Sequence, residues 1–213
     1  MDLYFSPMAC SLASRIAIYE SDAEGDVRFV EVDPKTKQTL DGANYREIYP
    51  LGLVPLIRLE DGALVSENAA ILQYVAGRFP RSRLAPDDAM GRTRLQQWLC
   101  FIGTELHKAL FVPLFDPKAP AGTRENILKK GESRLDYLDH HLRGREFLLE
   151  RYSVADAYLF TVLNWSVPTG VDLRRWPAIA AYHERLRSRP AIARALTEEM
   201  ALYKAELARH RAA

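Results

Sequence analysis

The chain of 213 residues has few cysteines, no long apolar run and no obvious targeting segment. Its two cysteines, Cys10 and Cys100, have no paired spacing, which argues against a disulfide framework and a multi-cysteine zinc site and favours a reducing compartment. No apolar stretch approaches the ~18 residues of a membrane helix. The opening "MDLYFSP" lacks the basic and apolar regions of a signal peptide. We therefore expect a soluble, cytoplasmic protein with no metal site and no membrane association.

The sequence also lacks an excess of either charge. Lys and Arg number 29 and Asp and Glu 28, which gives a net charge of +1, and the basic residues are interleaved with acidic ones. This pattern argues against a nucleic-acid-binding surface. Apolar residues make up 48% of the chain, enough for a packed core. No internal repeat or low-complexity tract is visible.

The first part of the chain alternates strand and helix patterns. Residues 3–5 form a short apolar run, 10–20 are amphipathic, and 27–32 alternate with period two. After a polar loop, Asp61–Gly62 separates two apolar runs and predicts a hairpin. Ser66 is the expected N-cap of the helix that follows. The order β-α-β, loop, β-β-α predicts a small sheet with helices.

Beyond residue 80 only helical patterns remain. Residues 80–89 contain two prolines and mixed charge and are interpreted as a linker. Apolar residues then recur at helical spacing from Leu95 to Leu110. Further helices are expected at 123–143, 153–165, 176–188 and 190–208, and Ser153 with Asp156 forms a capping-box pattern at the second of these. The second part is therefore predicted to be an all-α bundle.

Three interpretations of Cys10 are open from the residues alone. It is a small buried core residue, half of a redox pair, or a thiol at the start of a helix. Ala13 occupies the position that a C-x-x-C dithiol requires, so the second interpretation fails. At a helix start, unpaired backbone N–H groups and the macrodipole favour an anion, either this thiol or that of a bound ligand.

Two further patterns accompany Cys10. Val54–Pro55 stands at the entry of a strand, where a proline is tolerated. A cis bond there would present the Val54 backbone to an extended peptide, whereas an ordinary trans strand entry is the simpler alternative. Glu67 and Asn68 stand in a first helical turn, which suits a zwitterionic amino-acid end. A glutamate at a helix start is more often only stabilising.

These segments together resemble a glutathione transferase, and specifically the bacterial beta class. The similar stretches are "LYFSPMACSLASRIAI", "DPKTKQT…GANY", "PLGLVPLI", "SENAAILQYVA", "LQQWLCFIGTELHKAL" and "YSVADAYLFTVLNW", which cover essentially the whole chain. The resemblance implies a thioredoxin-like, glutathione-binding domain over residues 1–79, a linker over 80–89, and an all-helical domain over 90–213 that carries the hydrophobic substrate pocket. It also implies a homodimer.

The resemblance assigns roles to individual residues. Cys10 would lie beside the glutathione sulfur, and the cis Val54–Pro55 peptide would pair with the cysteinyl backbone. Glu67 and Asn68 would hold the γ-glutamyl end and Lys35 the glycyl carboxylate. In the helical domain the resemblance places the remaining site residues, with His107 as a second catalytic residue near the sulfur: Cys100, Thr104, Glu105, Leu106 and His107 at the glutathione site, and Phe111, Phe115 and Trp165 around the hydrophobic electrophile. Without the resemblance, His107 is a structural helical histidine.

Two positions depart from the family pattern. Relatives usually carry Gly or Ser at position 68 and often Asn at position 100, where this chain has Asn68 and Cys100. Helical spacing places Cys100, Thr104 and His107 on one face. This predicts that the Cys100 thiol points toward the site.

The implied reaction is attack of the glutathione thiolate on a hydrophobic electrophile, with glutathione as co-substrate and thiol–disulfide exchange or peroxidase chemistry through Cys10 as a side activity. Two other functions remain open: a non-catalytic carrier of glutathione or hydrophobic ligands, and a stress-regulatory interaction module. Retention of Cys10, Val54–Pro55 and Glu67 favours a working glutathione site, and the sequence does not name the electrophile.

Overall fold

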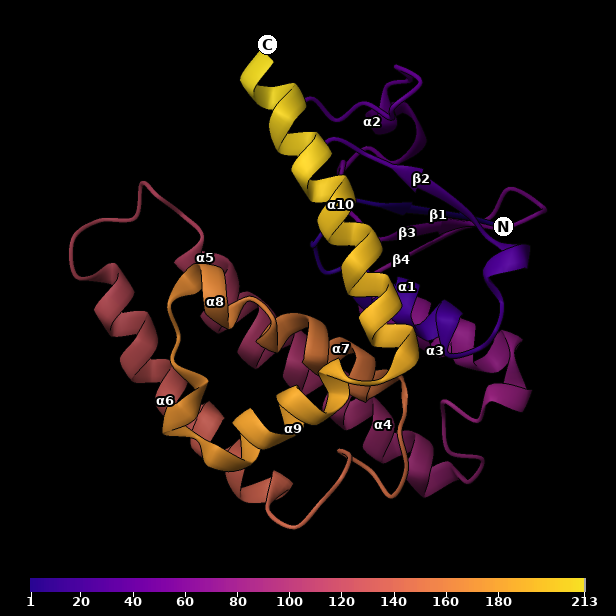
Figure 1. Cartoon of the computed structure of the whole chain (residues 1–213). Coiled ribbons are helices and arrows are strands. Elements are labelled where there is room, and N and C mark those ends of the chain that lie inside the picture. Colours follow the sequence, from indigo (N-terminus) through magenta and orange to yellow (C-terminus); the bar gives the residue numbers. More distant parts are fainter. Residues whose placement is uncertain (213) are drawn as a thin grey trace. The chain divides into compact units, whose positions relative to one another are not determined.

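The computed structural model describes residues 1–212, and this part of the chain divides into two compact units. The first unit combines residues 1–84 with the C-terminal segment from Pro190, and the second comprises Ala85–Arg189. The domain limits expected from the sequence placed residues 190–213 in the helical domain. The structure instead packs the C-terminal helix α10 (Pro190–Ala212) against α1 (Leu12–Tyr19) of the first unit, as Figure 1 shows.

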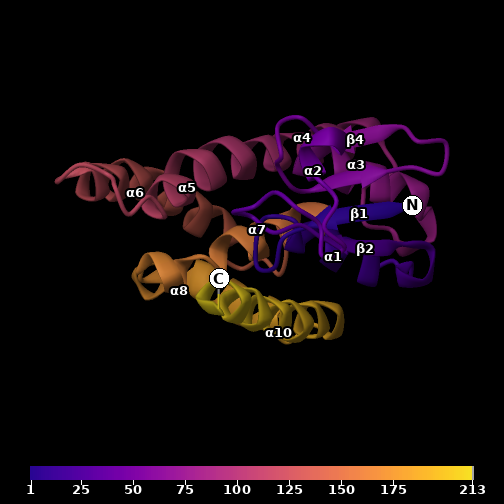
Figure 2. The ribbon, with the colours of Figure 1, turned by 90° about the horizontal axis from the view of Figure 1, so that it is seen from above.

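The first unit is built on one mixed sheet. Within the described residues its strands are β1 (Asp2–Phe5), β2 (Arg28–Glu31), β3 (Leu56–Arg58) and β4 (Leu64–Ser66), in the order β2-β1-β3-β4. β1 pairs in parallel with β2 and antiparallel with β3, which continues into the antiparallel β3–β4 hairpin. Figure 2 shows β1 and β2 running side by side. The predicted small α/β domain is confirmed.

The predicted hairpin is also confirmed. The Leu59 N–H donates to the Ala63 carbonyl at 2.9 Å, and Gly62 adopts a φ of +86° that a side chain would strain. Ser66 is not the N-cap that the sequence predicted. It ends β4, where it pairs with Leu56, and Glu67 becomes the residue that precedes α3 (Asn68–Arg78). The pairing requirement of the hairpin therefore moves the helix start by one residue.

Helices enclose this sheet. All eight residues of α1 are buried, since α1 packs against α3 and α10. A short helix, α2 (Tyr45–Ile48), supplies Tyr45 to a buried cluster with Tyr4, Val32 and Leu56. Two single 3₁₀ turns lie at Glu24–Asp26 and Pro80–Ser82. The consequence is that both ends of the described chain contribute to the same core.

The second unit is helical throughout, as predicted. Its elements are α4 (Ala89–Phe101), the π-helix η3 (Ile102–Phe111), α5 (Val112–Leu114), α6 (Thr123–Leu142), α7 (Val154–Leu163), α8 (Ser166–Thr169), the 3₁₀ turn η4 (Leu173–Arg175) and α9 (Pro177–Arg187). α4, η3 and α5 follow one another without a break (Figure 2). Every residue of α7 is buried, which makes α7 the centre of this unit.

The predicted capping box begins α7. Asp156 accepts hydrogen bonds from the Ser153 N–H at 2.8 Å and the Ser153 hydroxyl at 2.9 Å. Its second carboxylate oxygen accepts from the Leu148 N–H and the Tyr182 hydroxyl. Burial raises the pKa of this carboxyl, and the four donors favour its charged form. The capping box therefore also connects the preceding loop and α9 to the start of α7.

Candidate functional site

Cys10 lies in the turn that leads into α1. The Ala9 N–H donates to Ser6, Leu12 to Ala9, and Ala13 to the Cys10 carbonyl, all with the three-residue spacing of tight turns. The sequence analysis expected Cys10 at the start of the helix, but Ser11 is the N-cap and α1 begins at Leu12, so Cys10 stands one residue before the N-cap. Its side chain is half-buried. The thiol is thus accessible at the N-terminal end of α1, where the helix macrodipole is positive.

The Val54–Pro55 peptide bond is cis. The Cys10 thiol donates to the Val54 carbonyl oxygen, with 3.3 Å between sulfur and oxygen. Pro55 is buried and directly precedes β3, while Val54 is half-buried. The structure therefore brings Cys10 and Val54–Pro55 together, although they are far apart in the sequence.

The start of α3 lies beside the same turn. Glu67 is exposed and adopts a φ of +70°, which is uncommon for a residue with a side chain. The first helical hydrogen bonds are donated by Ala70 and Ile71 to the Glu67 carbonyl. The backbone N–H groups before them point out of the helix end and suit an anionic group.

The Asn68 side chain connects α3 to the Cys10 turn. Its Nδ2 donates to the Cys10 carbonyl oxygen at 2.9 Å, and its Oδ1 accepts from the Ser14 hydroxyl at 3.3 Å. Asn68 is 5% exposed. Four predicted residues of the first unit (Cys10, Val54, Pro55 and Asn68) are therefore connected by direct contacts or by chain adjacency, with Glu67 next to them in the chain.

Lys35 stands apart on a polar loop. Its side chain is exposed, and no contact of the ammonium group to Cys10 or Glu67 is found among the described residues. Asp33 shapes this loop, since its Oδ1 accepts from the N–H groups of Lys35 at 2.8 Å and Thr36 at 2.9 Å. His210 of α10 contacts the other oxygen, with 2.6 Å from Nε2 to Oδ2. Burial alone would raise the pKa of Asp33, but the Thr36 and Lys35 N–H groups and His210 lower it to about 2.

α10 also holds the segment before Cys10. Glu199 is fully buried and accepts from the Met8 N–H at 2.8 Å and from Arg15 Nε at 2.9 Å. Burial raises the pKa of Glu199 to about 7, although Arg15 and the Met8 N–H favour the carboxylate. Met8 has a φ of +60°, so this contact fixes an uncommon backbone conformation two residues before the thiol.

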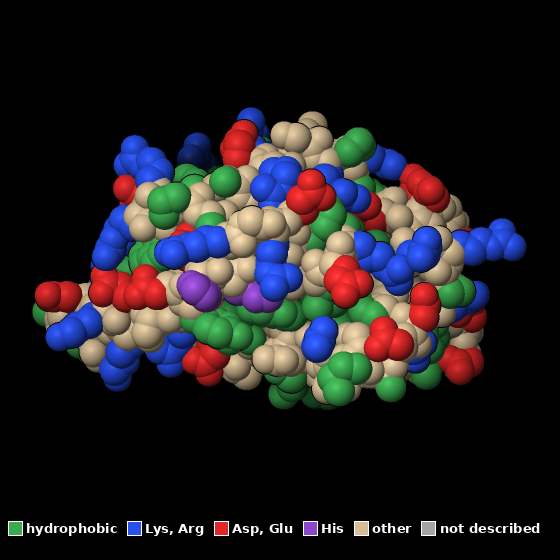
Figure 3. All heavy atoms as spheres, turned by 90° about the horizontal axis from the view of Figure 1, so that it is seen from below, with side chains coloured by type: hydrophobic (Ala, Val, Ile, Leu, Met, Phe, Trp, Pro, Cys, Tyr) green, Lys and Arg blue, Asp and Glu red, His purple; other side chains and the backbone are tan. Residues whose placement is uncertain are grey.

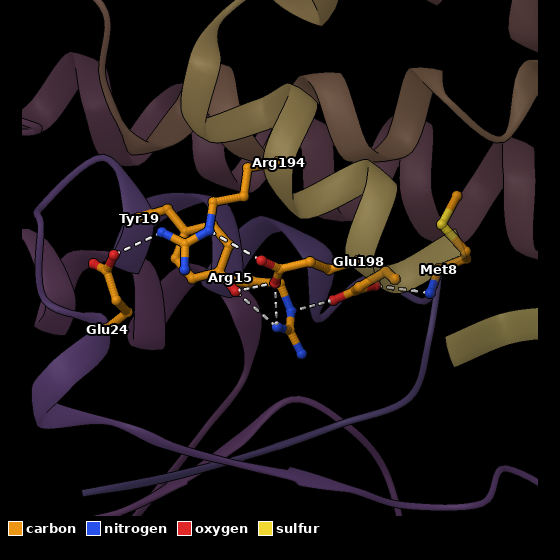
Figure 4. A network of polar contacts seen from close by, with 7 residues as sticks. Met8, Arg15, Tyr19, Glu24, Arg194 and Glu198 are labelled. Carbon is orange, nitrogen blue, oxygen red and sulfur yellow. Dashed lines mark hydrogen bonds and ion pairs between the residues drawn. The ribbon is translucent and has the colours of Figure 1, made fainter. Parts of the chain in front are cut away.

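Figure 4 shows how the contact of α1 with α10 continues beyond that carboxylate. Arg15 Nη1 donates to the Tyr19 hydroxyl at 2.9 Å, and Tyr19 in turn bonds Glu198. Arg194 connects Glu198, at 3.0 Å, to Glu24, at 2.6 Å. The sequence analysis missed these α10 residues, because no pattern of spacing relates residues nearly two hundred positions apart.

The second unit brings together the predicted aromatic residues and His107. We call them, with Tyr158, the Trp165 group: His107, Phe111, Phe115, Tyr158 and Trp165. Ring centroids of His107, Phe115 and Phe111 lie 5.0, 5.6 and 6.4 Å from that of Trp165. Phe111 is fully buried and Phe115 is 45% exposed. The group is thus a largely buried aromatic cluster in which Phe115 reaches solvent.

His107 is a buried, neutral member of this group. Its Nδ1 lies 2.7 Å from the Tyr158 hydroxyl. Burial, together with the adjacent Lys108 charge, lowers the pKa of His107 to about 4. Tyr158 was not predicted. Its place in the apolar run 153–165 was the available signal, because a buried tyrosine hydroxyl requires a partner.

Four other predicted residues on this stretch, Cys100, Thr104, Glu105 and Leu106, have different surroundings. Cys100 is exposed and accepts from the Gln96 side chain at 3.2 Å, and Thr104 donates to the Cys100 carbonyl at 3.0 Å. Glu105 forms an ion pair with Arg134 of α6 at 2.6 Å. Leu106 is buried. Cys100 is exposed and His107 is buried, and the π-helix that begins at Ile102 changes the helical periodicity between them.

Surface charge, potential metal ligands and apolar helices point to no further site among the described residues. Figure 3 shows basic and acidic side chains interspersed on the face that it displays. Among residues 1–212, no three His, Cys, Asp or Glu side chains gather as metal ligands. No helix within the described chain has the length and apolarity to cross a membrane. Two groups of residues therefore remain as candidates for a functional site: the Cys10 turn with the start of α3, and the Trp165 group.

Comparison with known proteins shows the family to which this chain belongs. Residues 104–190 match the family model described as the C-terminal domain of glutathione S-transferase. The glutathione S-transferase GstA of Escherichia coli O157:H7 is 39% identical over 93% of this chain and 98% of its own length. The chain belongs to the glutathione S-transferase family.

Solved structures agree with this assignment. A sphingomonad glutathione S-transferase, in complex with glutathione, matches 93% of this transferase and 98% of its own chain with a TM-score of 0.88 and 39% identity. The bacterial beta class enzyme of Sphingomonas chungbukensis matches the same shares with a TM-score of 0.87 and 38% identity. The resemblance to the beta class and the predicted fold class are therefore confirmed.

Proposed function

We propose that this transferase binds glutathione at the Cys10 turn and the start of α3 and transfers the alkyl or aryl group of hydrophobic electrophiles to its sulfur. The observation that carries the proposal is the convergence of three segments in one unit. The Cys10 thiol bonds the Val54 carbonyl and the Cys10 carbonyl is bonded by Asn68 at the start of α3. This arrangement supplies a sulfur, a strand entry for backbone pairing and a helix end for a carboxylate.

Each end of glutathione has a proposed partner. The exposed Glu67 carboxylate suits the γ-glutamyl ammonium group, and the N–H groups at the start of α3 suit its carboxylate. The backbone of Val54 suits the cysteinyl residue. Lys35 is proposed to reach the glycyl carboxylate from its polar loop, since its side chain is long and exposed.

In the reaction, the glutathione thiolate attacks an electrophilic carbon. The new carbon–sulfur bond forms as the bond to the leaving group breaks, and a halide departs with the electron pair. Lowering a thiol pKa by about two units requires about 2.7 kcal/mol of anion stabilisation. One charge-assisted hydrogen bond contributes about 1.5–3 kcal/mol, so the Cys10 S–H, once it turns from the Val54 carbonyl to the glutathione sulfur, and the α1 macrodipole suffice.

The helical unit has proposed roles of its own. Phe111, Phe115 and Trp165 are proposed to wall the electrophile pocket, because the Phe111 and Phe115 rings lie against that of Trp165 and Phe115 is exposed to solvent. The neutral His107 suits a hydrogen bond to a sulfur or leaving group. The roles predicted for Cys100, Thr104, Glu105 and Leu106 stay predictions.

Thiol–disulfide exchange is a second candidate function, favoured by the accessible Cys10 thiol. The Cys10 thiolate would attack the glutathione sulfur of a mixed disulfide and release the other thiol. A second glutathione thiolate would then displace Cys10 and leave as glutathione disulfide. Because Ala13 replaces a resolving cysteine, the second glutathione is required.

The test combines calorimetry with turnover. We expect reduced glutathione to release or absorb heat on titration into the full chain, and a chlorodinitrobenzene to be conjugated. Absence of both heat and turnover overturns the proposal. Heat without turnover favours the carrier function, and capture of a protein partner by a chain with no turnover favours the regulatory one.

Assembly and location are proposed in the same way. We expect a homodimer in the bacterial cytoplasm that detoxifies reactive compounds. Light scattering during size-exclusion chromatography measures the assembly directly, and a mass near twice the 24.2 kDa of one chain is the expected result.

A further inference from the structure

The Asn68 side chain occupies an unexpected place for a residue that is proposed to meet ligand. It is almost fully buried, and its amide points to the start of α1 and not to solvent. Its donor and its acceptor each have a protein partner, the Cys10 carbonyl at 2.9 Å and the Ser14 hydroxyl at 3.3 Å. The amide is therefore committed to contacts inside the first unit.

Together with the contact to Val54, these contacts hold both the backbone and the side chain of Cys10. The Cys10 carbonyl oxygen accepts from Asn68 Nδ2 and from the Ala13 N–H at 3.2 Å. The thiol bonds the Val54 carbonyl. The Cys10 carbonyl fixes which way the Asn68 amide faces, because it can only accept and a flipped amide would turn its own oxygen toward it, whereas the Ser14 hydroxyl can donate or accept. The orientation of the Cys10 turn thus depends on a side chain of α3.

We propose that Asn68 is a positioning residue for the Cys10 sulfur, and that its side chain does not contact glutathione. The inference rests on the proposed function, because it concerns the same site. It changes one assignment: glutathione contacts only the backbone N–H of Asn68, while the side-chain amide of Asn68 orients the Cys10 thiol. Gly or Ser, the residues that the family resemblance places here, cannot make both contacts, because neither carries an amide.

The proposal predicts that loss of the Asn68 amide changes the reactivity of the Cys10 thiol in the free protein but not the affinity for glutathione. Without the amide, the Cys10 turn gains freedom, so a small alkylating reagent reaches the thiol more often. The same freedom misaligns the thiol for exchange with bound glutathione, which needs a defined geometry. Alkylation should therefore become faster and disulfide exchange slower at an unchanged melting temperature, which separates this effect from general destabilisation.

The experiment compares Asn68→Ala and Asn68→Ser with the parent chain. Iodoacetamide labelling without glutathione is followed by peptide mass spectrometry, which separates Cys10 from Cys100. We expect Cys10 labelling to rise about fivefold and kcat for exchange to fall about fivefold, the size of one lost hydrogen bond, with KM for glutathione within about twofold. Gln73→Ala is the matched control, because its amide bonds a backbone carbonyl within α3, Ala69 at 2.9 Å.

Three outcomes contradict the proposal. Unchanged Cys10 labelling with a KM raised more than about fivefold assigns the side chain to ligand binding. A lower melting temperature with unchanged labelling assigns it a structural role alone. Equal effects of Gln73→Ala on Cys10 labelling and on kcat show that the loss of any side-chain hydrogen bond in α3 produces them. Labelling needs no glutathione, so the result stands even if calorimetry on the parent chain overturns the proposed function.

Discussion

The Cys10 sulfur lies 3.3 Å from the carbonyl oxygen of Val54, the residue before the cis proline. This contact joins the turn before α1 to the entry of β3. It places one reactive group where a captured peptide would pair with the backbone. The first prediction concerns this sulfur.

Cys10→Ala is expected to abolish disulfide exchange and to leave conjugation partly intact. Exchange needs a protein sulfur that forms a covalent intermediate, whereas conjugation uses the sulfur of glutathione. Rates with a mixed disulfide and with a chlorodinitrobenzene measure the two activities. Cys10→Ser is the control, because its hydroxyl still donates to Val54. Equal loss of both activities in Cys10→Ala contradicts this division.

His210→Ala is expected to raise KM for glutathione about three- to tenfold and to change kcat less. The histidine holds Asp33, which orders the backbone of the Lys35 loop, so its loss loosens the proposed carboxylate contact. Steady-state kinetics at varied glutathione measure the effect. The exposed His140 of α6 provides the control substitution, His140→Ala. An unchanged KM removes Lys35 or its loop from the binding site.

Tyr158→Phe is expected to lower the free energy of unfolding by about 1–3 kcal/mol, because it leaves the buried His107 Nδ1 without its partner. Urea unfolding measures the change. A double-mutant cycle with His107→Phe isolates the contact, since the double variant has no orphaned ring nitrogen. Additive losses in the cycle indicate that the two side chains do not interact.

His183→Phe is expected to stabilise the protein, and more so in acid. His183 stacks on Phe160 with ring centroids 4.9 Å apart, and its buried Nε2 has no hydrogen-bond partner among the described residues. Burial lowers its pKa to about 4, below the unfolded value of 6.5. Between these values the unfolded chain binds the additional proton, so wild-type stability falls as the pH decreases.

The advantage of His183→Phe should therefore grow by about 1–2 kcal/mol from pH 7 to pH 5. Urea unfolding of both proteins at each pH gives this difference. The exposed His140→Ala serves again as control and should show no such growth. A constant difference at both pH values contradicts a depressed pKa at His183.

Arg15→Met is expected to cost about 3–5 kcal/mol of unfolding free energy, because Glu199 becomes an unpaired buried carboxylate. The double variant with Glu199→Met should lose less than the sum of the single losses, since no buried charge remains. Chemical denaturation of the three variants measures both values. A double variant that loses the full sum shows that the pair contributes no mutual interaction.

Local signals predicted several elements correctly. The Asp61–Gly62 turn predicted the β3–β4 hairpin, and Ser153 with Asp156 predicted the start of α7. Both depend on residues within a few positions of one another, which a sequence displays directly. The family resemblance predicted the cis Val54–Pro55 bond, which the residues alone left open.

Long-range features escaped prediction. Helical spacing suggested a face shared by Cys100 and His107, but the π-helix from Ile102 is not encoded in a simple repeat. The partners of Met8 and Asp33 lie on α10, nearly two hundred residues away. Such pairs are fixed by tertiary packing, and one sequence without its fold contains no periodic trace of them.

The place of α10 has a consequence for how the protein is made. The first unit contains Met1–Leu84 and the segment from Pro190, so α1 lacks its contacts with α10 until the residues from Pro190 onward have been made. The helical unit, a continuous stretch, is complete earlier in synthesis. The nascent chain therefore carries an unfinished thiol-bearing unit until the codons for α10 have been translated.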